Sequence, residues 1–114
     1  MHVRVQWEDA ARLPVVAVHG ELDFETAPEL RRALIEAIGE QPGRPLVVDL
    51  EGVDFIDSAG LGVLVGGLKR VKDGGGELAL VATGRSVIRV LELTGLSRVF
   101  DIHPSRAAAL GAHE

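Results

Sequence analysis

The chain has 114 residues and a formal net charge of −5 at pH 7. This length suits one domain, residues 1–114, that folds without covalent staples. The acidic balance argues against nucleic-acid binding, which depends on Lys and Arg to neutralise phosphates, and the lack of cysteine excludes disulfides and thiolate metal sites.

The sequence also bears on where the protein resides. Residues 1–9 carry charges where a signal peptide needs an apolar core. The longest apolar run, residues 60–68, is much shorter than the ~20 residues of a membrane-spanning helix. We therefore expect a soluble cytoplasmic protein with no membrane insertion.

Strand patterns open the chain, and a helix follows them. Apolar residues at alternate positions in 3–7 predict a half-exposed edge strand, residues 8–13 a polar turn, and residues 14–20 a second strand. Thr26 and Glu29 form a capping-box pattern with Pro28 in the first turn, which predicts a helix from Thr26. Its apolar stripe consists of Leu30, Ala33, Leu34, Ala37 and Ile38.

Residues 46–72 read as strand, loop and helix. The branched aliphatic run 46–50 predicts a strand buried on both faces, and residues 51–57 a loop. Ser58 stands at the N-cap position of the next helix, so its hydroxyl is expected to accept a hydrogen bond from the first turn. By itself this position indicates only a helix cap.

The remaining elements continue the alternation. Residues 77–82 predict a strand, residues 87–93 a helix ended by Gly95, residues 99–102 a short strand, and Ser105 the cap of a last helix. The chain is therefore predicted to be an α/β domain, with a mostly parallel sheet of four to five strands, an N-terminal edge strand and about four helices.

In such a sheet the loops after the parallel strands share one rim, where function gathers. Asp23, Asp57, Ser58 and Thr83 are expected there. Ser58 as a hydrolase nucleophile would need a histidine base and an orienting carboxylate. The four histidines are poorly placed for that role, because they lie at the chain ends, in a strand or after the last strand: His2, His19, His103 and His113.

Three other chemistries are also poorly supported. No two histidines have the i, i+4 spacing of a metal site, and the glycines at 74–76 lie outside any phosphate-binding loop pattern, which argues against independent nucleotide binding. Asp49, placed at the end of the predicted strand 46–50, could be an aspartyl phosphoacceptor. That role requires an acidic pair for Mg²⁺ and a late lysine, yet lysine occurs only at positions 69 and 72.

Phosphorylation of Ser58 is better supported. A phosphate at a helix N-terminus faces free N–H groups and the positive end of the helix dipole. It would add a charge of about −1.5 to −2 on the rim. The folded domain could tolerate this charge, whereas a partner docked on the rim would meet it.

The ordered motifs of the chain resemble those of the anti-sigma-factor antagonists, small stand-alone STAS domains of bacteria. The resemblance covers almost the whole chain. Its matching segments are residues 20–23 with Thr26 and Ala27, then 48–50, 55–62 and 90–96. It implies a non-enzymatic protein without a cofactor, either a monomer or a weak homodimer.

The resemblance implies that Ser58 is phosphorylated by an anti-sigma factor with GHKL-type serine kinase activity. The unphosphorylated form would bind this kinase and release the sigma factor, and a serine phosphatase would restore binding. The expected partner-binding residues are Asp23, Thr26, Asp57, Ser58, Ala59, Gly60, Leu61 and Thr83. Ala59 departs from the second Ser or Thr of many relatives, which leaves Ser58 as the only hydroxyl in that segment. The alternative is a STAS scaffold subunit of a stress-sensing or lipid-transport complex, without phosphorylation.

Overall fold

The structure, a computed structural model, describes residues 2–8, 13–40 and 42–111 and the side chains from residue 14 onward within these ranges. Five strands form one sheet in the order β1-β2-β3-β4-β5. They are β1 (His2–Glu8), β2 (Leu13–Leu22), β3 (Leu46–Ile56), β4 (Leu78–Val81) and β5 (Asp101–His103). β1 runs antiparallel to β2 and all other neighbouring strands are parallel, which confirms the predicted sheet. The polar turn was expected at residues 8–13, but Glu8 belongs to β1 and Leu13 to β2. Residues 9–12 and the side chains of the predicted alternation in 3–7 lie outside the described residues.

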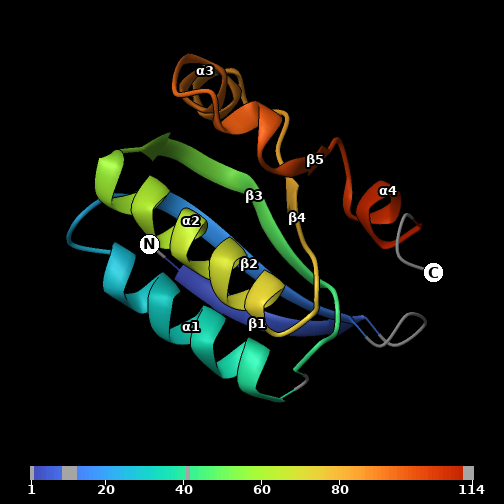
Figure 1. The fold of residues 1–114 in the computed structure, drawn as a ribbon. Helices are drawn as coiled ribbons and strands as arrows, with labels where there is room; N and C mark the ends of the chain where they lie inside the picture. Colours follow the sequence, from blue (N-terminus) through green and yellow to red (C-terminus); the bar gives the residue numbers. More distant parts are fainter. Residues whose placement is uncertain (1, 9–12, 41, 112–114) are drawn as a thin grey trace.

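The helices cover the two faces of the sheet unequally. α1 (Ala27–Glu40) and α2 (Ser58–Asp73) lie side by side on one face, as Figure 1 shows. α3 (Arg85–Leu93) flanks the far half of β3, and the short α4 (Arg106–Gly111) packs on the opposite face through Ala109. No helix in the described ranges is long and apolar enough to cross a membrane.

Alternation along the strands divides the core between these faces. Val16, Val48 and Leu80 point toward α1 and α2, and pack with leucines of both helices. Val15, Val47, Ala79 and Val81 point the other way, where Ala109 of α4 covers them. The central strands are therefore buried on both faces, which is why their sequences read as continuous aliphatic runs.

The prediction for residues 51–57 was wrong, because β3 continues to Ile56 and only Asp57 falls outside the strand. The extension pairs with β2 through two register shifts, and it runs beyond β4, whose last partner on β3 is Asp49. Its outer residues are therefore partly exposed, so the apolar run that marks the buried half of the strand stops at Leu50.

The C-terminal part agrees with the predicted order and differs in detail. Gly95 follows the end of α3 with φ of 78°, the left-handed conformation of a helix stop. Ser105 Oγ accepts from the Ala108 N–H at 3.1 Å, as expected for the cap of α4. A 3₁₀ turn, η1 (Leu96–Arg98), was not predicted, and the last strand begins at Asp101 rather than at residue 99.

Candidate functional site

The candidate site lies where β2 and β3 end together. Leu22 and Ile56 are partners in the parallel ladder, so the loop after β2 and the start of α2 emerge at the same edge of the sheet. The backbone N–H of Asp57 donates to the Leu22 carbonyl at 3.1 Å and extends this pairing by one residue. Asp23 and Asp57, which are distant in sequence, are thereby brought together as predicted.

Asp57, and not Ser58, caps α2. Its Oδ1 accepts from the Gly60 N–H at 3.0 Å, the bond that an N-cap side chain makes with the first turn. Its Oδ2 accepts from the Phe24 N–H at 3.1 Å across the gap to the loop after β2. The prediction that Ser58 is the cap was wrong by one residue, because this second bond fixes the cap at Asp57.

Ser58 is consequently the first residue of the helix, and it is exposed. Its hydroxyl makes no hydrogen bond to any described residue. The backbone N–H groups of Ser58 and Ala59 also lack an acceptor within the described part of the chain, as is usual for the first turn of a helix. A free hydroxyl thus stands beside free donors at the positive end of α2.

Gly60 and Leu61 hold this turn against the sheet. A Cβ atom on Gly60 would lie 2.8 Å from the Leu22 carbonyl oxygen and 3.1 Å from Ile56 Cγ1, so only glycine allows this approach. Leu61 belongs to the main core. Both residues are buried. They therefore hold Ser58 in position and offer little surface for a partner to contact.

Hydrogen bonds within the loop after β2 order it. Asp23 Oδ1 accepts from the N–H groups of Glu25 and Thr26 at 3.0 and 3.1 Å. The Thr26 hydroxyl accepts from the Asp23 N–H at 2.9 Å and lies 2.9 Å from the Glu21 carbonyl, to which it donates. α1 starts at Ala27, so Thr26 stands at the helix start as predicted. The capping-box bond was wrong, because the Glu29 N–H donates to the Thr26 carbonyl at 3.0 Å while the Thr26 hydroxyl bonds to the loop.

Thr83 does not join this group. Its hydroxyl donates to Glu51 Oε2 at 2.8 Å, which places it level with the middle of β3. Ile56 lies five residues farther along the strand, about 16 Å at about 3.3 Å per residue. The rim predicted from strand ends therefore fails for β4, since β4 stops well short of the end of β3.

Two exposed aromatic side chains at the site were missed by the sequence reasoning. Phe24 is 71% exposed and directly follows Asp23, and Phe55, two residues before Asp57, is 50% exposed. Exposed aromatic side chains often anchor protein partners. The available signal was their position beside a strand end, in a chain with only three phenylalanines and one tryptophan.

Asp49 is engaged elsewhere. It lies in the interior of β3, where its Oδ2 pairs with Nε of Arg106 on α4 at 2.5 Å, and its Oδ1 accepts from the Glu51 N–H at 2.9 Å. The prediction that Asp49 ends a strand was wrong, and a carboxylate so buried and paired is a poor phosphoacceptor. In the described residues no cluster of three His, Asp or Glu could hold a metal.

The two histidines whose side chains are described lie away from Ser58. His19 is the ladder partner of Gly52 on β3, and a Cβ atom on that glycine would overlap the His19 ring. His103 on β5 pairs with Asp101 at 2.9 Å. Neither supplies the base that a serine nucleophile requires.

Comparisons with known proteins agree with this fold. The STAS domain family model matches residues 4–109. An anti-sigma F factor antagonist of Paenibacillus polymyxa is 32% identical over 110 residues, which cover 96% of this chain and 94% of that protein. An anti-sigma-B factor antagonist of Bacillus subtilis (strain 168) is 42% identical over 87 residues, which cover 76% and 78% of the two chains.

The crystal structure of an anti-sigma factor antagonist from Mycobacterium paratuberculosis superposes with a TM-score of 0.87 at 34% identity, covering 98% of this chain and 92% of that one. Its fold therefore matches the present one over nearly the full length of both chains. The chain belongs to the STAS domain family.

Proposed function

We propose that this protein is an anti-sigma factor antagonist controlled by phosphorylation of Ser58. In the unphosphorylated form it binds an anti-sigma factor that is also a serine kinase, and the sigma factor is released. The names of the relatives support the first part of this proposal, since proteins similar over 76–96% of this chain are called anti-sigma factor antagonists.

The observation that carries the proposal is the division of roles between Asp57 and Ser58. Asp57 makes the cap hydrogen bonds, so the Ser58 hydroxyl is exposed and has no partner among the described residues. In the proposed reaction the γ-phosphoryl group of ATP passes to Ser58 Oγ, ADP leaves, and a base on the kinase takes the hydroxyl proton. This chain supplies only the acceptor, so it acts as a regulatory binding module and not as an enzyme.

The charge of the phosphate provides the switch. Phosphoserine adds about −1.5 to −2 at neutral pH beside Asp57 and near Asp23. The N-terminus of α2 stabilises this charge within the folded domain. A partner that covers Ser58 and the exposed Phe24 meets new bulk and charge, and a loss of about 3 kcal/mol lowers affinity about a hundredfold. A serine phosphatase would restore binding.

Binding of two variants tests the proposal. We expect Ser58→Ala to bind the anti-sigma factor as tightly as the unphosphorylated protein, and Ser58→Asp to bind about a hundredfold more weakly, measured by calorimetry. Ser86→Asp is the matched control: Ser86 is also exposed, but its hydroxyl donates to the Asp54 carbonyl at 3.1 Å. Equal affinities of Ser58→Ala and Ser58→Asp would refute the switch.

The scaffold alternative makes a different prediction about the native protein. Phosphorylation of Ser58 should appear in some growth conditions when the protein is recovered from its own cell and analysed by mass spectrometry. Consistent absence of phosphate across conditions would favour a STAS scaffold subunit.

A further inference from the structure

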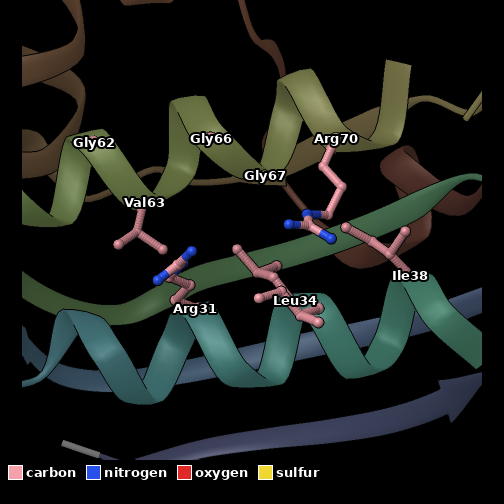
Figure 2. A pocket seen from close by; sticks show the side chains of 9 residues that line it. Arg31, Leu34, Ile38, Gly62, Val63, Gly66, Gly67 and Arg70 are labelled. Atoms are coloured by element: carbon pink, nitrogen blue, oxygen red, sulfur yellow. The ribbon is translucent and has the colours of Figure 1, made fainter. Parts of the chain in front are cut away.

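A groove separates α1 and α2, apart from the Ser58 site. Its cavity volume is about 210 Å³. The α1 wall consists of residues spaced i, i+3, i+4 and i+7: Arg31, Leu34, Ile35 and Ile38. Figure 2 shows Leu34 and Ile38 pointing from α1 into the space between the two helices, and Val63 pointing into it from α2 beside Arg31. Apolar side chains from both helices therefore form part of the groove lining.

Three of the α2 residues that line the groove are glycines, so no side chains from these positions fill it. Gly67 is explained by packing inside the protein, because a Cβ atom there would lie 2.9 Å from Leu34 Cδ1. Gly62 and Gly66 also line the groove, yet a Cβ atom at either position would meet nothing within 4 Å. Glycine weakens a helix relative to alanine, and internal packing does not require it at these two positions. Their effect is to leave the groove open.

The groove also carries two positive charges. Arg31 and Arg70 line it, and Figure 2 shows both guanidinium groups in the space between the helices. Neither forms an ion pair within the described part of the chain, and no acidic residue is among those that line the groove. Arginine stems often cover apolar surface, but no carboxylate among the residues that line the groove neutralises these two guanidinium groups. In a chain of net charge −5 this is a local reversal of charge.

We propose that this groove binds a small organic anion that carries one carboxylate or phosphate and a short apolar group. The guanidinium groups suit the head, since arginine binds carboxylate and phosphate through paired hydrogen bonds. Leu34, Ile38 and Val63 suit the tail. The volume lies below the range of about 300–1,000 Å³ of pockets for drug-sized ligands, which favours a ligand of few atoms.

This site is distinct from the proposed phosphorylation site. Val63 follows Ser58 by five residues on α2, about 7.5 Å along the helix axis at about 1.5 Å per residue. A ligand in the groove would contact the helix that begins with Ser58 without covering its hydroxyl. The proposal does not rest on the proposed function, and it can be tested on the isolated protein without a kinase.

Titration of the ¹⁵N-labelled protein with sodium octanoate, followed by NMR, tests the proposal. We expect saturable shifts of the amides of Gly62, Val63, Gly66 and Gly67. The dissociation constant should be on the order of 10⁻⁴ to 10⁻³ M, as expected for a ligand of about ten non-hydrogen atoms. Octyl phosphate should shift the same amides, and butanoate should bind at least tenfold more weakly.

Variants locate the two halves of the site. Arg31→Gln and Arg70→Gln should each weaken octanoate binding at least fivefold. Arg32→Gln removes the same charge from the neighbouring exposed position outside the groove, and should leave binding unchanged. Gly66→Leu should abolish binding while the protein stays folded, since its Cβ atom has open space and leucine favours helix.

Three results would overturn the proposal. Octanoate could leave the groove amides unmoved. Octylammonium could bind there as tightly as octanoate, which would mean that the arginines select nothing. Inorganic phosphate alone could bind as tightly as octanoate, which would mean that the apolar wall has no role.

Discussion

Asp49 and Asp57 lie eight residues apart, one inside β3 and the other just after its end, and their carboxylates have different partners. Asp49 faces the side of the sheet covered by α4, where it is buried and paired with Arg106. Asp57 stands at the end of β3, where both of its oxygens accept backbone N–H groups. Both carboxylates hold elements together, so neither is free for chemistry.

The contrast isolates Ser58. In the turn that starts α2, Asp57 accepts the hydrogen bond of the Gly60 N–H, and Gly60 allows the close approach to β2. The Ser58 hydroxyl has no such structural task within the described residues. The structural role of Asp57 and the proposed role of Ser58 thus fall on neighbouring residues, and substitutions can separate them.

The largest loss of stability is expected at Asp49. Asp49→Ala removes the ion pair with Arg106 and the acceptor of the Glu51 N–H. We expect the free energy of unfolding to fall by about 2–3 kcal/mol, less than the 3–5 kcal/mol for a fully buried pair, because Arg106 is partly exposed. Urea unfolding measures this, and a loss below 0.5 kcal/mol, the scale of ordinary surface substitutions, would contradict a structural role.

Two glycines of α2 should respond in opposite directions. Gly60→Ala forces a Cβ atom toward the Leu22 carbonyl and should destabilise the protein by about 1–3 kcal/mol. Gly62→Ala places its Cβ atom in open space and should stabilise by up to about 1 kcal/mol, because alanine favours helix. The difference between the two in thermal or urea unfolding is the test, and equal effects would show that the close approach at Gly60 is unimportant.

A smaller loss is expected at the cap. Asp57→Ala removes the acceptors of the Gly60 and Phe24 N–H groups, and should lower the free energy of unfolding by about 1–2 kcal/mol. Asp57→Asn retains one good acceptor and should lose less. If the Ala and Asn variants unfold at the same urea concentration, the one acceptor that Asn retains contributes nothing to stability.

The smallest effect on stability is expected at Ser58. Because its hydroxyl caps nothing, Ser58→Ala should change the free energy of unfolding by less than about 0.5 kcal/mol. The same unfolding experiment on Asp57→Ala provides the contrast. If Ser58→Ala lowers the free energy of unfolding by 1 kcal/mol or more, Ser58 and not Asp57 would be the residue that caps α2.

The sequence predicted the elements whose signals are local and strong. The aliphatic runs gave the central strands, and the apolar stripes gave α1 and α2, since both patterns follow from burial. The extension of β3 was not predicted, because it pairs with β2 only and because the register shifts in this pairing disturb the alternation of buried and exposed residues. Its Glu51 and Gly52 then resemble a loop.

The expectation that Asp23 and Asp57 meet at the strand ends was met, but the cap was assigned to the wrong residue. Asp and Ser are both favourable N-caps, so the pair Asp57 and Ser58 left the cap ambiguous by one position. The bond from the Phe24 N–H resolves it, and that bond joins residues 33 apart. Thr83 was misplaced for a related reason: the sequence does not reveal that β4 is shorter than β3.

Phosphorylation by the anti-sigma factor tests the central claim most directly. The purified protein is incubated with that kinase and ATP, and the modified residue is mapped by peptide mass spectrometry, with Ser58→Ala in parallel. The account predicts a single phosphate per chain, located on Ser58 and absent from the variant. A phosphate on another residue, or none on a protein that binds the kinase, would contradict it.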